Sequence, residues 1–278
     1  ILKDRSVSMI KYKAEGVRRE AETKKSFAVA YCLRVMPLKA IFFDAAGTLI
    51  KTTRPVGESY ALLAKKHGME VLPEEIRERF RVCFSSAPPL AFPGAEAHQI
   101  KDLERQWWKE LVKKIFEPYG WFADFDNYFS ELFHYFSKPE SWSLYPDTTE
   151  TLAALRERGF ILLVISNFDS RLLPILNGLG IVSQFESVVI SSQVGFAKPA
   201  PEIFQAALGL YRLKPEEALH VGDSPDKDAA GASAAGLTGV LLDRSGRAVL
   251  DSFQRVRNLK EILSLLSIAR SRHGQRKT

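Results

Sequence analysis

Short apolar runs alternate with helix-like segments along most of this chain, and this order restricts the possible folds more than any other feature. The runs are four to six residues long and mainly apolar at consecutive positions. Such runs are typical of strands that are buried on both faces of a parallel sheet. We predict five strands, at 38–43, 160–165, 185–190, 218–221 and 237–242.

Helical segments with recognisable boundaries lie between the predicted strands. Segments 147–158 and 170–179 are each followed by a glycine, and segment 201–211 begins with a proline in its first turn. Glycine after a helix and proline in its first turn are common stop and start signals. Strand and helix thus alternate, and we predict an α/β fold with a doubly wound, mostly parallel, Rossmann-like sheet.

The alternation is interrupted once, after the first strand, where about 100 residues carry helical patterns and little strand signal. A connection between a strand and a helix normally takes a few residues, so this stretch is predicted to be an inserted helical module. Leu103, Trp107, Leu111 and Ile115 recur at four-residue spacing, which indicates one apolar helix face. We predict helices at 56–67, 74–84, 98–116 and 125–136.

These patterns divide the chain into a core, an insert and two ends. The core is predicted to comprise 36–50 and 146–267, and the helical cap 51–145. We expect 1–35 to be a disordered or non-native extension that precedes a start at Met36. A transit peptide is the alternative, but the four acidic residues of this segment oppose it.

The positive charge of the chain lies at its ends. The net charge is +6, yet residues 36–267 hold 26 basic and 29 acidic residues. We expect 268–278 to be a basic C-terminal tail, with four basic residues and no acidic one. A body without a basic excess is not expected to bind nucleic acid. The patterns do not indicate an oligomeric state.

Cysteine content and hydropathy bear on the compartment. The two cysteines, Cys32 and Cys83, are too few for a disulfide scaffold and suit a reducing environment. No apolar run approaches the 18 or so residues that a membrane span requires. We therefore expect a cytoplasmic protein that does not bind membranes.

Polar residues follow directly after four of the predicted strands. The first strand is followed by Asp44 in DAAGT, and the second by Ser166 and Asn167. Lys198 follows the third strand after a short loop, and the segment GDSPDKD follows the fourth. The carboxyl ends of parallel strands meet at one edge of the sheet, where ligands bind. A carboxylate nucleophile, a hydroxyl, an ammonium group and a carboxylate cluster at this edge are suited to attack and hold a phosphoryl group.

These four motifs in this order resemble those of the haloacid dehalogenase superfamily of hydrolases, over roughly residues 37–243. Within the superfamily, the segments VISNFD and GFAKPAPEIF and the cap pieces PVGESYALLAKKHG and RQWW are most similar to the rhythmically-expressed-gene-2-like branch. The resemblance implies a hydrolase with a Rossmann-like core and a helical cap inserted after the first motif.

The resemblance also implies roles for the motif residues. Asp44 would be the nucleophile that forms an aspartyl-phosphate. Ser166, with neighbouring main-chain N–H groups, and Asn167 would bind the phosphoryl oxygens. Lys198 would offset the negative charge of the carboxylates and the phosphoryl group.

A magnesium site is implied at the same edge. Mg²⁺ would be bound by Asp44, the main-chain carbonyl of Ala46 and Asp223, because this ion favours a few carboxylates together with water and phosphate oxygens. Asp228 begins the next helix, and it could be a metal ligand, a support for one, or a helix N-cap.

Ala46 departs from the family pattern. Phosphatases of this family usually carry a second aspartate two residues after the nucleophile, as the acid for the leaving group and then the base for water. Alanine cannot transfer a proton, and such assistance is typically worth about 10²–10⁴-fold in rate.

Three functions are compatible with Ala46. The first is a Mg²⁺-dependent phosphatase for a small phosphorylated metabolite, restricted to good leaving groups or assisted by an acid from the cap or the substrate. The second is a different hydrolysis at Asp44, as in phosphonoacetaldehyde hydrolases, which resemble this motif, or in metal-independent dehalogenases. The third is a catalytically weakened binding or regulatory module. Retention of the whole polar set favours an enzyme.

Other charged residues near the motifs have open assignments. Lys51 and Arg54 follow the first motif, and they could contact an anionic substrate or face solvent. The five histidines show no spacing typical of metal ligands. His220 lies within a predicted strand and is expected to be a packed core residue.

Overall fold

The computed structural model describes residues 38–120, 124–246 and 253–271, with side chains described as far as residue 267. The segment 1–35 predicted to precede the fold lies outside the described residues. Of the predicted C-terminal tail, only the first residues are described, and they continue the last helix, α11 (Lys260–Ser271).

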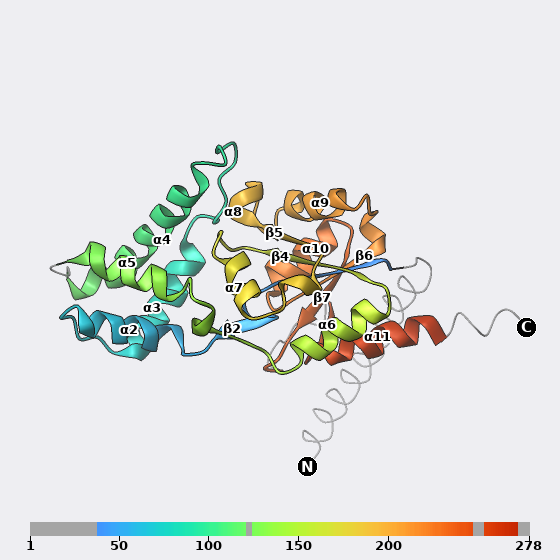
Figure 1. Cartoon of the computed structure of the whole chain (residues 1–278), viewed down its shortest axis with the longest axis horizontal. Coiled ribbons are helices and arrows are strands. Elements are labelled where there is room, and N and C mark those ends of the chain that lie inside the picture. The colour runs from blue at the N-terminus through green and yellow to red at the C-terminus, as the bar shows by residue number, and fades with distance from the viewer. Residues whose placement is uncertain (1–37, 121–123, 247–252, 272–278) are drawn as a thin grey trace, which may run out of the picture.

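A six-stranded sheet forms the core of the molecule, with the strands in the order β5-β4-β1-β6-β7-β8 (Figure 1). Every pair of neighbouring strands is parallel. The five predicted strands are all present, which confirms the α/β, mostly parallel fold. The strands are β1 (Ala40–Phe43), β4 (Ile161–Ser166), β5 (Ser187–Ile190), β6 (Ala218–Gly222), β7 (Thr238–Leu242) and β8 (Gln254–Val256).

Helices cover both faces of the sheet, which explains why its strands are apolar at consecutive positions. Ile41 and Phe43 belong to one buried cluster, and Ala40 and Phe42 belong to another on the opposite face. The first cluster includes residues of α6 (Thr148–Glu157), α7 (Leu172–Gly178) and α11, and the second includes residues of α9 (Pro201–Leu210) and α10 (Gly231–Ala234).

The inserted segment forms a helical cap with its own aromatic core, at the left of Figure 1. It contains the four predicted helices, α2 (Val56–Lys66), α3 (Pro73–Ser86), α4 (Ile100–Phe116) and α5 (Phe125–Tyr135). One detail of the prediction is wrong. Leu103 is 36% exposed, and its neighbour Glu104 is only 2% exposed. The reason is that this turn of α4 faces the core domain, where Glu104 finds hydrogen-bond donors.

Two short strands that the sequence pattern did not predict connect the cap to the core. They are β2 (Ile50–Thr52) and β3 (Trp142–Leu144), which pair antiparallel with Lys51 opposite Ser143. Strands of three residues are too short to produce a recognisable alternation. The remaining elements are α8 (Ser191–Val194), the short 3₁₀ helices η1 (Glu117–Tyr119), η2 (Pro139–Ser141), η3 (Val182–Gln184) and η4 (Pro215–Glu217), and the π-helix η5 (Pro225–Ala230).

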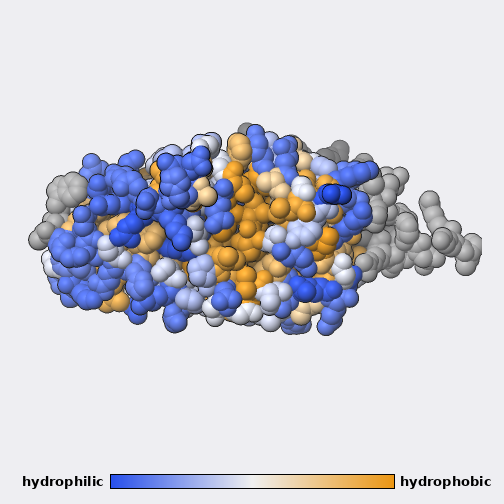
Figure 2. All heavy atoms as spheres, turned by 45° about the horizontal axis from the view of Figure 1, so that its top comes forward, coloured by the Kyte–Doolittle hydropathy of each residue, from blue (hydrophilic) through white to orange (hydrophobic). Residues whose placement is uncertain are grey.

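The surface differs between the two parts. On the face shown in Figure 2, the cap is mainly hydrophilic, and hydrophobic residues gather over the middle of the molecule. Within the described part of the chain, no helix combines the length and the apolarity needed to cross a bilayer.

Candidate active site

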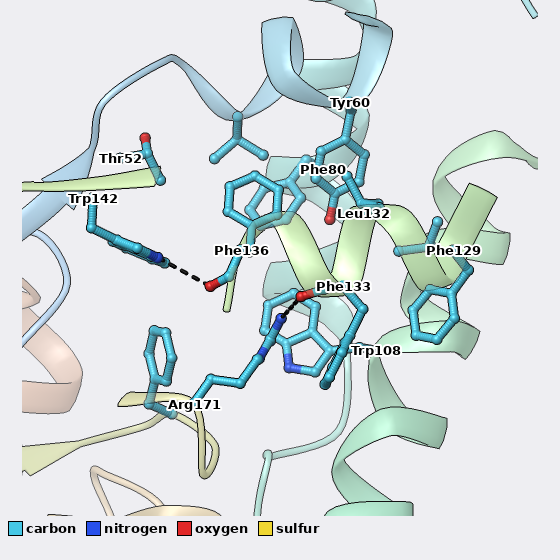
Figure 3. Close-up of a pocket in the computed structure, with 13 residues that line it drawn as sticks. Thr52, Tyr60, Phe80, Trp108, Phe129, Leu132, Phe133, Phe136, Trp142 and Arg171 are labelled. Atoms are coloured by element: carbon cyan, nitrogen blue, oxygen red, sulfur yellow. Dashed lines mark hydrogen bonds between the residues drawn. The ribbon is translucent and has the colours of Figure 1, made fainter. Parts of the chain in front are cut away.

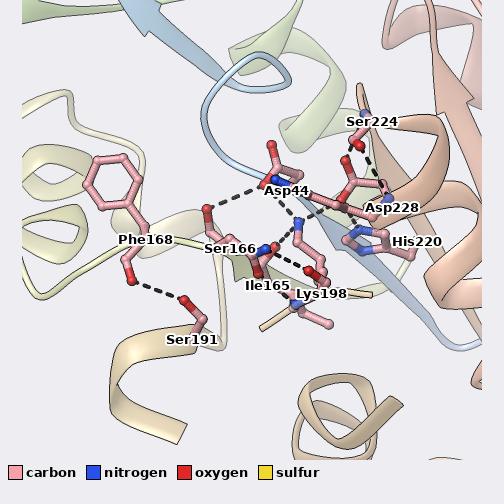
Figure 4. A network of polar contacts seen from close by, with 11 residues as sticks. Asp44, Ile165, Ser166, Phe168, Ser191, Lys198, His220, Ser224 and Asp228 are labelled. Carbon is pink, nitrogen blue, oxygen red and sulfur yellow. Dashed lines mark hydrogen bonds and ion pairs between the residues drawn. The ribbon is translucent and has the colours of Figure 1, made fainter. Parts of the chain in front are cut away.

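Three of the predicted residues meet at the carboxyl edge of the sheet. Asp44 directly follows β1, and its main-chain N–H donates to Val221 O of the neighbouring strand β6 at 2.9 Å. Ser166, the last residue of β4, places its Oγ 3.4 Å from Asp44 Oδ1. Lys198 Nζ lies 2.8 Å from the same carboxylate oxygen (Figure 4). The predicted nucleophile therefore has a hydroxyl and an ammonium group beside it.

Lys198 is held at its ammonium group and at its main chain. Its Nζ also donates to Asp228 Oδ1 at 2.6 Å and to Ile165 O at 2.8 Å. Its main chain is bound by Asn167, which accepts from Lys198 N at 2.7 Å and donates Nδ2–H to Lys198 O at 2.8 Å. The side-chain amide of Asn167 is therefore engaged with the lysine, and the structure favours a positioning role for it.

Electrostatics favour the charged forms of Lys198 and Asp228 in spite of their burial. Burial alone would lower the pKa of Lys198, but the ion pairs with Asp228 and Asp44 outweigh it, and the pKa is raised. Burial raises the pKa of Asp44, and Lys198 partly offsets this. Burial opposes ionisation of Asp228 as well, but Lys198 and His220 hold its pKa well below the usual range. The lysine thus remains a cation that faces the nucleophile.

Asp228 is fully engaged with protein groups. Its Oδ1 contacts Lys198 Nζ and lies 3.0 Å from His220 Nε2, and its Oδ2 accepts from Ser224 N at 2.9 Å. His220 is completely buried, as expected of a core residue, and burial lowers its pKa. Its contact with Asp228 was not expected, because residues of a strand and of the following turn meet only in the folded chain. The pair orients Lys198.

The acidic residues form a group that can hold a metal ion. Ligand atoms of Asp44, Asp223 and Asp228 all lie within 4.8 Å of one another. Among the described residues, none makes a hydrogen bond or an ion pair with the Asp223 side chain, which faces the cleft. Burial, followed by repulsion from Asp44 and Asp228, raises the pKa of Asp223 to about 7. A cation at this point would remove that penalty.

The main chain beside Asp44 fits the same ion. None of the described donors is bonded to the carbonyl oxygen of Ala46, a residue that lines the cleft. Gly47 has a φ of +95°, and a side chain at this position would overlap the Asp223 carboxylate. Glycine here lets the first loop approach Asp223 closely. Two carboxylates and one carbonyl, all oxygen donors, match the preference of Mg²⁺.

A cleft of about 510 Å³ lies between these groups and the cap. Lys51 lines it, with its Nζ 5.4 Å from the centre of the Tyr145 ring. Lys227 also lines it, 5.7 Å from the ring of Phe84 in the cap, and this residue lies within the GDSPDKD segment without having been predicted as a site residue. Arg54 lies elsewhere, because it lines a separate depression on the cap surface. Lys51 and Lys227, together with Lys198 but without Arg54, therefore supply positive charge at the cleft.

Polar contacts join the cap to the loop that follows Ser166 and to α8. Glu104 Oε1 accepts from Ser170 N, Ser170 Oγ and Ser192 Oγ at 3.0, 2.9 and 2.6 Å. Trp108 Nε1 donates to Asp169 Oδ2 at 2.6 Å. The only sequence signal for these contacts was a run of polar residues after Ser166, and it did not indicate their partners.

Known proteins were compared with this fold and site. A family model described as haloacid dehalogenase-like hydrolase matches residues 38–236, well over half of the chain. The chain belongs to the haloacid dehalogenase-like hydrolase family. This hydrolase is 36% identical over 211 residues to haloacid dehalogenase-like hydrolase domain-containing protein 3 of Homo sapiens, with 74% of this chain and 82% of that protein covered. The resemblance noted in the motifs is confirmed.

Two further relatives carry phosphatase names. The hydrolase is 31% identical over 230 residues to a phosphoserine phosphatase of Thermus thermophilus, with 76% of this chain and 90% of that protein covered. A crystal structure of a HAD phosphatase from Thermococcus onnurineus matches with a TM-score of 0.61 and 27% identity, over 82% of this chain and 98% of that one.

Proposed function

We propose that this hydrolase is a Mg²⁺-dependent phosphatase that acts on a small phosphorylated metabolite through an aspartyl-phosphate at Asp44. One observation carries the proposal: Asp44 contacts Ser166 and Lys198, and the unpartnered Asp223 carboxylate faces the same cleft. The phosphatase names of two relatives support the reaction class. The low cysteine content supports a cytoplasmic location.

The reaction would proceed in two displacements at phosphorus. A carboxylate oxygen of Asp44 attacks the phosphoryl group, and the bond from phosphorus to the leaving-group oxygen breaks, with the electron pair departing on that oxygen. Water then attacks the aspartyl-phosphate, releases inorganic phosphate and restores the carboxylate.

Charge stabilisation comes from the groups around the nucleophile. Lys198 and Ser166 stabilise the charge on the phosphoryl oxygens. A Mg²⁺ ion held by Asp44, Asp223 and the Ala46 carbonyl would supply further positive charge there.

Ala46 determines which leaving groups depart readily. This residue is exposed to the cleft, and its methyl group cannot donate a proton to a leaving oxygen. Alkoxides therefore depart slowly, because they require that proton. The leaving groups of aryl and acyl phosphates depart without a proton, since they are stable as anions. We propose that the natural substrate carries such a leaving group.

A hydrolysis panel tests the proposal. Aryl, acyl and alkyl phosphates, phosphonoacetaldehyde and 2-haloacids are offered with and without Mg²⁺ to the wild type, Asp44→Asn and Ala46→Asp. Asp226→Asn is the matched control, because Asp226 is an exposed carboxylate next to the site. We expect turnover of aryl or acyl phosphates that requires both Mg²⁺ and Asp44.

The Ala46→Asp variant addresses the missing acid. It should increase turnover of alkyl phosphates, by up to about 10²–10⁴-fold if the new carboxylate reaches the leaving oxygen. Halide release without a metal would replace the proposal with a dehalogenase. A wild type inactive on every phosphate, with activity gained in Ala46→Asp, would indicate a binding module instead.

A further inference from the structure

A second, apolar cavity adjoins the cleft on its cap side. Its volume is about 80 Å³. Its walls come from the cap, the linker strands and the loop after β4, and several aromatic side chains surround it (Figure 3). Six residues line both the cavity and the catalytic cleft: Thr52, Val56, Phe80, Trp108, Trp142 and Phe168. The cavity is therefore the continuation of the cleft on the side opposite the nucleophile.

The charged group at the cavity is already neutralised. Arg171 pairs with Asp169 through two nitrogens, at 2.8 and 2.6 Å, and its third nitrogen donates to Phe133 O at 3.2 Å. Its guanidinium also stacks on the Phe133 ring, 3.9 Å from the ring centre. A second anionic group of a substrate would find no free cation at this end of the described structure.

One polar atom that faces the cavity has no protein partner among the described residues. Tyr60 is 2% exposed, and its ring packs against Phe80, Phe116 and Phe136. Figure 3 shows its hydroxyl pointing into the ring of side chains that line the cavity. Among the described residues, none is hydrogen-bonded to this hydroxyl. A hydroxyl at an apolar cavity wall without a protein partner can donate or accept a hydrogen bond with a group bound there.

We propose that this cavity binds the leaving group of the substrate, and that this group is a neutral apolar or aromatic body with one hydrogen-bonding atom for Tyr60. The inference rests on the proposed phosphatase function and narrows its substrate class. Apolar walls with a few placed polar groups are typical of small-molecule sites. The same class also suits Ala46, because an aryl oxygen departs without a protein acid.

The size of the cavity sets the size of the group. An engineered cavity of roughly 150 Å³ holds a benzene molecule. The cavity of about 80 Å³ therefore accepts one edge of a ring with a short substituent. The remainder of the ring lies in the adjoining cleft, between the phosphoryl group and the shared aromatic walls.

A series of aryl phosphates tests the inference on the intact protein. Phenyl, methylphenyl, ethylphenyl and isopropylphenyl phosphates, substituted at position 3 or 4, have leaving groups of similar acidity and increasing apolar size. We expect kcat/KM to rise by about fourfold per buried carbon until the cavity is full. Val112→Phe, which fills the cavity from α4, should abolish the rise, and Val82→Phe, at an exposed position of α3, should retain it.

A matched pair of substrates tests the hydroxyl. Ethylphenyl and hydroxymethylphenyl phosphates have nearly the same shape and differ by one hydrogen-bonding atom. Tyr60→Phe should lower kcat/KM for the hydroxymethyl compound by about tenfold relative to the ethyl compound. Tyr119→Phe, which removes an exposed cap hydroxyl bonded to Glu75, should not change that ratio.

The experiments distinguish an incorrect cavity inference from an incorrect phosphatase proposal. Turnover that requires Asp44 and Mg²⁺ but is flat along the alkyl series would overturn the cavity inference and leave the phosphatase proposal intact. Binding is measured separately with Asp44→Asn, through the fluorescence of Trp108 and Trp142, which line the cavity. Affinity that increases along the series in this variant supports the cavity even without turnover, and affinity that does not increase overturns it.

Discussion

Removing the Glu104 carboxylate should loosen the cap from the core. Glu104 is 2% exposed, and its Oε1 accepts hydrogen bonds from one main-chain N–H and two hydroxyls of the core domain. In Glu104→Ala these three donors lose their acceptor, at a cost of about 1–3 kcal/mol for each buried donor left unpaired. The two hydroxyls can rotate toward new partners, and the cost of burying a carboxylate disappears. We therefore expect a net loss of about 2–4 kcal/mol.

The conservative variant separates hydrogen bonding from charge. All three donors bind the same oxygen, so the side-chain carbonyl of Glu104→Gln can accept from each of them. This variant should remain within about 1 kcal/mol of the wild type. Glu110→Ala, an exposed carboxylate on the same helix, is the control and should change stability by less than about 0.5 kcal/mol.

Urea unfolding, monitored by far-ultraviolet circular dichroism, measures these differences from the transition midpoints. Activity reports the same contact in a second way, because Trp108 on the same helix lines both the cleft and the cavity. Glu104→Ala should raise KM for aryl phosphates more than it lowers kcat. If Glu104→Ala is as stable as Glu110→Ala, the contacts of Glu104 do not hold the cap, and the reasoning is refuted.

Three further results are expected. Burial raises the pKa of Glu104, so the folded state binds its proton more tightly than the unfolded chain does. The free energy of unfolding of the wild type relative to Glu104→Gln should therefore be highest below pH about 4.3, the pKa of glutamate in the unfolded chain. It should decrease as pH rises through the higher pKa of Glu104 in the folded state, and urea midpoints measured across this pH range would show the decrease. Adding Mg²⁺ should raise the thermal unfolding midpoint of the wild type and of Asp226→Asn but not of Asp223→Asn, and an equal shift in all three would exclude Asp223 as a ligand. Lys198→Met leaves two carboxylates buried without a cation and should cost about 3–5 kcal/mol in urea unfolding, and a loss below about 1 kcal/mol would contradict the charge balance described above.

Much of the fold was predictable because its signals are local. The central strands β1, β4, β6 and β7 are largely buried on both faces, so each appears as a mainly apolar run. The three-residue strands β2, β3 and β8 were missed, since a run of this length carries no periodicity. On α4 the pattern indicated an amphipathic helix with Leu103 on its apolar face. In the structure Leu103 is exposed and its neighbour Glu104 is buried. Periodicity marks the apolar face of a helix and cannot show that a neighbouring face meets a second domain.

Part of the candidate site was also predictable from the sequence. Asp44, Ser166, Lys198 and Asp223 were identified because strand ends of a parallel sheet converge, a consequence of chain order and strand direction alone. The absence of an acid at Ala46 was equally visible in the sequence. These features depend on which residues follow which strands, and packing does not alter them.

Only the tertiary structure decided how the site is completed. It bonds Asp228 to Lys198 and His220, places Arg54 away from the cleft, and directs the Tyr60 hydroxyl into an aromatic cavity that adjoins the cleft. The contacts of Asp228 depend on how the loops and strands of the core pack together, whereas the positions of Arg54 and Tyr60 depend on how the cap folds and packs. The candidate catalytic residues were therefore predictable from the order of the chain, whereas the shape of the cleft and the cavity beside them arose from long-range packing.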